Sequence, residues 1–319
     1  MMYEIKDEAN GARRGRALLG GVLCALLFCP SMSIAQSGAS AQRLFSSPED
    51  GAKALVEAIR ANDEPALREM LGRRGVDLIG LRRPSSEPGQ RERFLAAYDE
   101  ASKLEPQGDA KMLLEVGKDA WPFPIPLVKT AGGWRFDTRL GEQEVLVRRI
   151  GRNELAAMQV CLAIADAEHE YAAFDWDRNG VLEYAPKFMS TPGKRDGLYW
   201  ESASGGTLSP LGPFVAAAGI DSGASRVTQS RAPYHGYFYR ILKRQGKNAK
   251  GGAYPYVVHG KMIGGFALIA YPARYGYTGV KSFIISHDGE LYEKDLGRNT
   301  QAVAEKIQEF DPDPSWKRP

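Results

Sequence analysis

The chain has 319 residues, of which 43% are hydrophobic, and carries a formal net charge of +3 at pH 7. This composition is ordinary for a globular protein, and the length suits two modest domains or one large one. The near-neutral charge contains no long run of one sign, so it gives no support to nucleic-acid binding.

Residues 1–35 have the pattern of a secretory signal. A basic stretch containing Arg13, Arg14 and Arg16 precedes an apolar run at 17–29, and small residues follow at positions 33 and 35. The apolar run is shorter than the ~20 residues that a membrane span needs. We therefore expect a periplasmic or secreted protein, with an uncleaved signal that anchors it to the membrane as the alternative. Removing these residues takes away four basic and three acidic side chains, which leaves a net charge of +2 and no membrane span in the mature chain.

Cysteine usage agrees with export. Cys24 and Cys29 lie in the signal, so the mature chain keeps Cys161 and cannot form an internal disulfide. Cys161 lies between Met158 and Leu162 on an apolar helical stripe, which predicts a buried side chain rather than a nucleophile.

Helices are expected first in the mature chain. Ser47-Pro48 provides an N-cap and a first-turn proline for a helix that ends at Asn62-Asp63. A second, short helix follows around Met70. Residues 72–90 are rich in Arg, Pro and Gly and are expected to form a connection, after which 94–98 form a short helical piece.

Strands are expected next, at 111–116, 126–129 and 133–138, with Gly132-Gly133 as a hairpin signal. The stretch 121–126, WPFPIP, cannot be a central strand because its three prolines donate no hydrogen bonds. We expect it to form an edge or an extended lid.

A long helix is predicted from about residue 142 to 174, with Gly151 as a candidate break. Apolar residues at helical spacing predict one buried stripe, formed by Leu155, Met158, Leu162 and Ala165. Arg148, Arg149 and Arg152 cluster at the start of this helix, where they could bind an anionic group or form a solvated helical face.

The C-terminal part contains further strands and a closing helix. Strands are expected at 237–243, 264–271, 280–286 and 290–293, and the helix runs from 299 or 300 to 310. Tyr237 and Tyr239 share one strand face, which indicates sheet packing or, if they are exposed, stacking on sugar rings.

Six stretches carry a resemblance to a known family: WPFPIPLVKTAGGWRFDT, RRIGRNELAAMQ, GKRDGLYW, SPLGPF, PYHGYFYRIL and KSFIISHDGELYEKDLG. With them the chain resembles the bacterial domain of unknown function 2950 over about residues 44–310. The resemblance implies an exported protein and brings no known activity.

Two looser resemblances suggest an α+β architecture. The helices and strands of 44–140 resemble the cone-shaped, often pocketed domains of the nuclear transport factor 2-like type. The helix NELAAMQVCLAIADAEHEYAA and the later strands are similar to pilin-like domains, in which a long helix packs on an antiparallel sheet. In true pilins the membrane anchor and helix are continuous, whereas here about a hundred residues separate them. The expected organisation is a signal at 1–35, a tether at 36–43, the cone-like domain at 44–140, the pilin-like domain at 141–310 and a loose tail at 311–319.

An acidic turn after the long helix resembles the first half of a calcium-binding EF-hand loop. Its candidate calcium ligands are Asp175, Asp177, Asn179, the Val181 carbonyl and Glu183. Pro186 stands where a bidentate Glu should close the loop, so a complete EF-hand is excluded. Two alternatives stay open: a partial calcium site completed by a segment such as Asp196, and a helix-terminating turn in which Asp and Asn bond their own backbone.

Complete catalytic motifs are absent from the sequence. The four histidines form no HExxH pair, and there is no GxSxG elbow, phosphate loop or dinucleotide fingerprint. Glu168-His169-Glu170 is expected on a solvent-exposed helix face. We therefore predict a non-enzymatic binding or structural module of the cell envelope, with an envelope protein or glycan as partner. The alternative is a periplasmic hydrolase or ligand-processing protein with its site near Trp121, Trp134 and Asp137.

Overall fold

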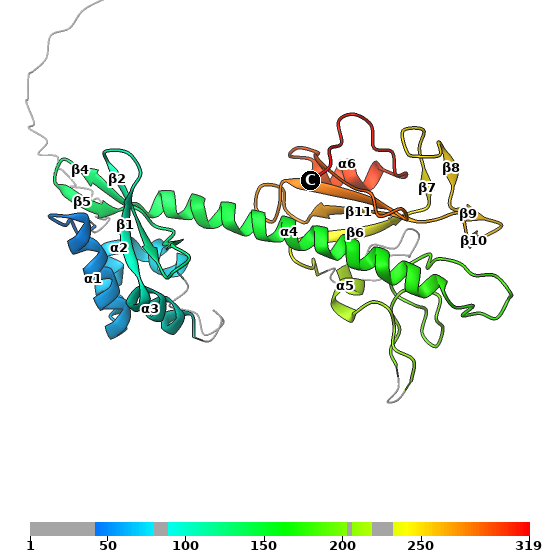
Figure 1. The fold of residues 1–319 in the computed structure, drawn as a ribbon, viewed down its shortest axis with the longest axis horizontal. Helices are drawn as coiled ribbons and strands as arrows, with labels where there is room; N and C mark the ends of the chain where they lie inside the picture. The colour runs from blue at the N-terminus through cyan, green and yellow to red at the C-terminus, as the bar shows by residue number, and fades with distance from the viewer. Residues whose placement is uncertain (1–41, 80–88, 203–205, 219–231) are drawn as a thin grey trace, which may run out of the picture. The chain divides into compact units, whose positions relative to one another are not determined.

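The computed structural model describes residues 42–79, 89–202, 206–218 and 232–319 (Figure 1). The expected secretory signal and all but the last two residues of the tether lie outside the described residues. The chain is an α+β protein with two hydrophobic cores, one built from residues between Phe45 and Phe136 and the other from residues between Ala157 and Trp316.

Three helices cover the N-terminal core. In α1 (Pro48–Ala61) the Ser47 hydroxyl accepts a hydrogen bond from the Asp50 N–H at 3.1 Å, as the cap motif predicts. The helices α2 (Glu64–Leu78) and α3 (Gln90–Glu100) follow. Residues 73–78 are helical, contrary to the predicted connection at 72–90, of which 80–88 lie outside the described residues. Gly72, with φ of 70°, makes a kink that an ordinary L residue would resist, and the helix resumes beyond it.

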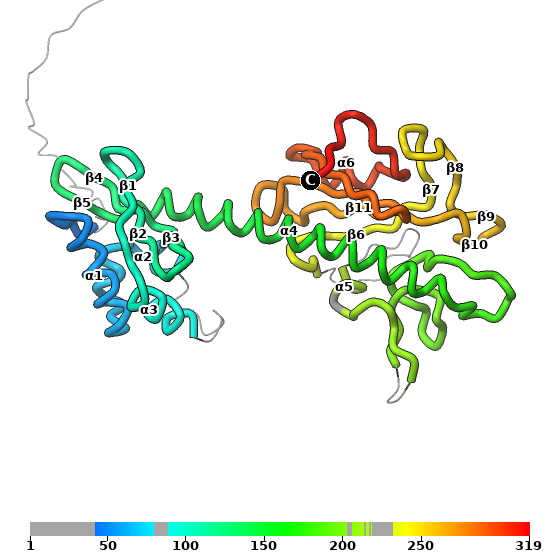
Figure 2. The backbone as a smooth tube through the Cα atoms, viewed as in Figure 1, coloured from blue at the N-terminus to red at the C-terminus, as the bar shows by residue number. Residues whose placement is uncertain are grey.

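The N-terminal sheet is antiparallel with the order β1-β2-β4-β5, and β3 pairs with β2 (Figure 2). Its strands are β1 (Ser102–Pro106), β2 (Lys111–Val116), β3 (Trp121–Pro122), β4 (Leu127–Thr130) and β5 (Gly133–Phe136). The sequence pattern missed β1. The WPFPIP stretch forms an edge at β3, as one of the two alternatives predicted. The lid alternative is wrong, because Phe123 and Ile125 are 4% and 1% exposed and belong to the core.

Helix α4 (Thr138–Ala172) runs for 35 residues and passes through Gly151 without a break. The Asp137 carboxylate accepts a hydrogen bond from the Leu140 N–H at 3.1 Å, and the Thr138 hydroxyl donates to the Leu71 carbonyl at 2.5 Å. Gly141 faces Ile125 so closely that an added Cβ would lie 2.7 Å from the Ile125 Cγ1. These contacts attach the first turns of α4 to the N-terminal half.

The predicted buried stripe of α4 is right for Ala165, which is buried, and for Met158, which is partly buried and packs against the core, but it is wrong for its two leucines. Leu155 and Leu162 are 62% and 38% exposed. The buried face instead follows a heptad-like spacing through Ala157, Cys161, Ile164, Glu168 and Tyr171. Because Ala157 and Cys161 are small and Glu168 is acidic, a search for large apolar residues overlooks this face.

The C-terminal sheet is antiparallel with the order β13-β12-β11-β6. Its strands are β6 (Tyr237–Leu242), β11 (Ala267–Pro272), β12 (Lys281–Ser286) and β13 (Leu291–Asp295). Helix α4 packs on β11 and β12, and α6 (Thr300–Lys306) lies against β11 on the other side of the sheet (Figure 1). Arg240 reaches that side and donates hydrogen bonds to the Ala304 and Ile307 carbonyls at the end of α6.

The remaining short elements are α5 (Pro213–Ala218), β7 (Arg244–Gln245), β8 (Tyr254–Pro255), β9 (Val257–Val258) and β10 (Lys261–Met262).

The C-terminal segment 311–319 is bound to the sheet rather than loose. Glu293 and Lys317 exchange two backbone hydrogen bonds of 2.7 and 3.0 Å, and Trp316 is 8% exposed. The expectation failed because backbone pairing with β13 and burial of one indole hold a segment whose composition is polar and proline-rich.

Several side chains predicted to be buried are indeed in the C-terminal core. Cys161, Tyr237 and Tyr239 are fully buried, which confirms sheet packing over sugar stacking. Burial raises the pKa of the Cys161 thiol to about 12, so the thiolate needed for nucleophilic attack is disfavoured. Within the described part of the chain, no helix is both long and apolar enough to cross a membrane.

Glu168 is a buried carboxyl group that the sequence placed on a solvent-exposed face. It is fully buried, and its Oε2 accepts a hydrogen bond from the Ala185 N–H at 2.8 Å. Its Oε1 has no hydrogen-bond partner among the described residues. Burial raises the pKa of Glu168 well above its ordinary value, although the Ala185 N–H acts in the opposite direction.

The pH dependence of stability tests the state of Glu168. The pKa of the Glu168 carboxyl is higher in the folded protein than in the unfolded chain. The contribution of Glu168 to folding stability is therefore fully present below the unfolded-state pKa and is lost as the pH rises through the folded-state pKa. Glu168→Gln should remove a slope of up to about 1.4 kcal/mol per pH unit from the unfolding free energy. Urea unfolding between pH 5 and pH 9 measures it, with the exposed Glu170→Gln as the control. If the unfolding free energy has the same pH slope in the parent protein, Glu168→Gln and Glu170→Gln, the raised pKa of Glu168 is wrong.

Two glycines of α4 provide a matched test of the close approach to Ile125. Gly141→Ala places a Cβ against Ile125 and should cost about 1–3 kcal/mol by overpacking. Gly151→Ala meets nothing within 4 Å and should stabilise the helix by about 0.5–1 kcal/mol. Urea unfolding at pH 7 measures both, and equal changes in the two variants would rule out a tight contact at Gly141.

Candidate functional site

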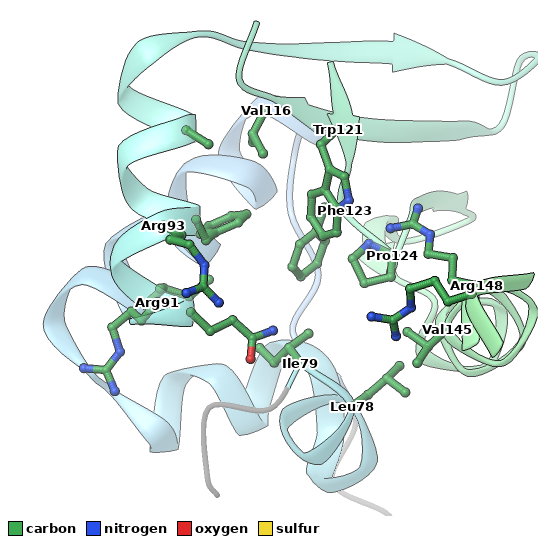
Figure 3. A pocket seen from close by; sticks show the side chains of 15 residues that line it. Leu78, Ile79, Arg91, Arg93, Val116, Trp121, Phe123, Pro124, Val145 and Arg148 are labelled. Atoms are coloured by element: carbon green, nitrogen blue, oxygen red, sulfur yellow. The ribbon is translucent and has the colours of Figure 1, made fainter. Parts of the chain in front are cut away.

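The N-terminal half contains a cavity of about 660 Å³, which is within the size range of small-molecule sites (Figure 3). Its described walls are formed by α1, α2, α3, the end of β2, the segment that follows β2, and the N-terminal part of α4. The lining residues are Ile59, Leu78, Ile79, Gln90, Arg91, Arg93, Phe94, Ala97, Val116, Trp121, Phe123, Pro124, Val145, Arg148 and Arg152.

Aromatic side chains form much of the apolar wall. The ring centroids of Phe94 and Phe123 are 5.7 Å apart, and Phe123 also contacts Phe136 of the core with a centroid distance of 6.4 Å. Trp121 lies at the edge of the sheet in β3 and is 48% exposed. An exposed indole beside an apolar cavity provides a large contact surface for a ligand.

Arg148 is held by two neighbours. Its Nε donates to the Glu144 carboxylate at 2.7 Å, one helical turn away, and its guanidinium lies 5.1 Å from the centroid of the Trp121 ring. Its Nη1 is buried and has no hydrogen-bond partner within the described ranges, and neither has the Nε of Arg91.

All ionisable side chains among the described lining residues are arginines, namely Arg91, Arg93, Arg148 and Arg152. A guanidinium donates hydrogen bonds and offers no acceptor, so these side chains cannot serve as a general base. The arrangement is suited to holding a ligand, through an apolar wall and several positively charged donors.

The residues predicted for the hydrolase alternative do not come together at this cavity. Trp121 lines it, whereas Trp134 and Asp137 do not. Trp134 pairs with Phe45 through two backbone hydrogen bonds of 2.8 Å, and Asp137 caps α4. The sequence pointed to Arg148 and Arg152 as candidate anion ligands but missed Arg91, Arg93 and Phe94. Only the packing of α3 opposite α4 brings these residues to the same cavity.

The acidic turn at 175–183 is held by hydrogen bonds within itself. The Asp175 carboxylate accepts from the Asn179 N–H at 3.1 Å and from the Gly180 N–H at 2.7 Å. The Asn179 side chain donates to Asp177 and accepts from the Val181 N–H at 2.8 Å. These contacts correspond to the turn alternative, in which side chains satisfy local backbone donors.

Two of the predicted calcium ligands meet at a lysine. The Lys261 ammonium lies 2.6 Å from an Asp177 oxygen and 2.7 Å from a Glu183 oxygen. The hydrogen bond from Lys261 lowers the pKa of Asp177 to about 2, and the same bond raises the pKa of Lys261 to about 12. Asp196, the suggested completing ligand, pairs with Lys187 at 3.0 Å and accepts from Thr191. Among the described residues, no group of three or more His, Cys, Asp or Glu is arranged to hold a metal ion.

A second cavity of about 660 Å³ adjoins the acidic turn. Its lining mixes acidic and basic side chains with Trp176. The Arg195 guanidinium lies over both Trp176 and Trp200, at 5.2 and 5.5 Å from their ring centroids. The lining of this cavity includes the acidic side chains of Asp177, Glu183 and Asp196, whereas the described lining of the N-terminal cavity contains no acid.

Comparison with protein families gives a match to the family described as "Protein of unknown function (DUF2950)", over residues 42–318. The chain belongs to this family. The match includes all of the described elements, so the cavity and the acidic turn both lie in the family region. Comparison with curated proteins and with solved structures gives no match.

Calcium binding at the acidic turn stays a prediction with a direct test. Millimolar calcium should raise the melting temperature, and Asp177→Ala should abolish the shift. Lys261→Met removes the internal cation that neutralises Asp177 and Glu183, so it should enlarge the shift. Thermal unfolding with calcium, with magnesium as the control ion, measures the effect. If calcium raises the melting temperature of neither the parent protein nor Lys261→Met, the calcium prediction is wrong.

Proposed function

We propose that this protein is an exported, non-enzymatic binding module of the cell envelope whose N-terminal half holds a small, largely apolar molecule. The observation that carries the proposal is the 660 Å³ cavity, which has aromatic and aliphatic walls and, among its described lining residues, only arginine as an ionisable type. Export to the periplasm or beyond is supported by the signal pattern of residues 1–35.

The proposed architecture combines two known types. A cone-like domain of the nuclear transport factor 2-like type is supported by helices packed on an antiparallel sheet with a cavity between sheet and helices. A pilin-like domain is supported by the packing of α4 on a four-stranded antiparallel sheet. In this proposal the first domain binds the ligand, and the second presents a surface to an envelope protein or glycan.

The hydrolase alternative has less support. Hydrolysis needs a nucleophile or activated water with a base placed to accept its proton. The described lining of the cavity offers guanidinium, amide and apolar groups, and the Asp137 carboxylate is engaged at the start of α4. Binding therefore explains the composition of the cavity better than catalysis does.

A cavity-filling variant tests the proposal. Val145 lines the cavity, whereas Val147, two residues along the same helix, is 64% exposed and is not part of the lining. The neutral fluorescent probe N-phenyl-1-naphthylamine should bind the parent protein with increased emission. Val145→Trp should weaken this binding at least tenfold, because the indole occupies the ligand's space, while Val147→Trp should leave it unchanged.

Circular dichroism and thermal unfolding would check that both tryptophan variants remain folded. The proposal fails if the parent protein does not bind the probe, or if folded Val145→Trp binds it as tightly as Val147→Trp does.

A further inference from the structure

The arginines of the cavity come from two elements that face each other. Arg91 and Arg93 belong to α3, and Arg148 and Arg152 belong to α4. Figure 3 shows Arg93 and Arg148 on opposite sides, with Phe123 and Trp121 between them. Like charges around an apolar space repel one another, and they create a positive potential that favours an anion inside it.

The helical repeat separates the arginines that serve the cavity from the one that does not. Arg148 and Arg152 are four residues apart and therefore lie on the same face of α4. Arg149 lies on another face, where its guanidinium is 4.6 Å from the centroid of the Tyr277 ring. The cluster seen in the sequence is thus two cavity arginines and one arginine that contacts the C-terminal half.

Arg148 has a hydrogen-bonding group that the protein does not satisfy. Glu144 accepts from its Nε, and the described residues supply no acceptor to its buried Nη1. Buried donors without a partner are rare in folded proteins. An oxygen of a ligand placed in the cavity would supply the missing acceptor.

The guanidinium is also preorganised. The Trp121 ring lies beneath it at 5.1 Å, and Glu144 holds one edge at 2.7 Å. A guanidinium that is fixed in this way presents its remaining N–H groups in a planar fork, which matches two oxygens of a carboxylate or phosphate. Arg152 is exposed on the same face and forms no ion pair with any described residue, so its charge is available to the same head group.

We infer that the ligand is an amphipathic anion, whose apolar chain packs against Phe94 and Phe123 and whose carboxylate or phosphate head group binds Arg148 and Arg152. This inference rests on the proposed function and adds the charge class of the ligand and the residues that select it. The shared chemistry is an anionic oxygen group on an apolar chain.

Displacement of N-phenyl-1-naphthylamine from the purified protein by three twelve-carbon compounds tests the inference. Dodecanoate and dodecyl phosphate should displace the probe at concentrations about ten- to a hundredfold lower than dodecanol, which has the same chain without the charge. The stronger of the two anions identifies the head group as carboxylate or phosphate.

Arginine variants show whether the two named residues cause the preference. Arg148→Gln combined with Arg152→Gln should reduce the affinity for both anions to that for dodecanol and leave dodecanol unchanged. Arg149→Gln on the same helix is the matched control and should behave like the parent protein. If the double variant does not fold, Arg152→Gln alone should still lower the affinity for the anions, because Arg152 is exposed and makes no ion pair with the described residues.

The results separate this inference from the proposed function. Equal displacement by all three compounds, or an equal loss of anion affinity in Arg149→Gln and in the double variant, overturns the anion inference while apolar binding stands. Failure of the parent protein to bind the probe overturns the proposed function itself.

Discussion

The close contact between the first turns of α4 and the N-terminal half is the interaction on which the cavity depends. Gly141 has no side chain where Ile125 approaches, and the Thr138 hydroxyl donates to a carbonyl at the kink of α2. Because α4 is continuous from this point, the contact determines where Val145, Arg148 and Arg152 lie. A looser start to the helix would move one wall of the cavity away from Phe123 and Trp121.

The charged side chains of the acidic turn and those of the cavity differ in how far other side chains of the protein neutralise them. At the acidic turn, Asp177 and Glu183 are neutralised by Lys261 from another segment, and local amides satisfy Asp175. At the cavity, Glu144 offsets part of the charge of Arg148, and the described lining contains no acid. Internally paired charges support the structure, whereas charges of one sign on the described lining of a cavity favour a ligand of the opposite sign.

Buried polar groups also organise the C-terminal half. Arg240 is 6% exposed and donates to carbonyls at the end of α6, where a helix has unsatisfied acceptors and a negative dipole end. Glu168 links α4 to the chain at Ala185 on the far side of the acidic turn. The Arg240 and Glu168 side chains each connect elements that are distant in the sequence. Burial of each side chain costs desolvation free energy, which its hydrogen bonds only partly offset.

By itself the sequence determined the α+β class, the cap of α1, the burial of Cys161 and the central strands, because these follow from local periodicity and capping chemistry. It also pointed to the arginine cluster of α4. It predicted only part of the buried face of that helix: Cys161 and Ala165 are buried as expected, whereas Leu155 is exposed and Glu168 is buried. It could not reveal that Lys261 occupies the acidic turn, or that α3 places Arg93 and Phe94 opposite Arg148. Those contacts join residues tens of positions apart, and tertiary packing alone decides which of them meet.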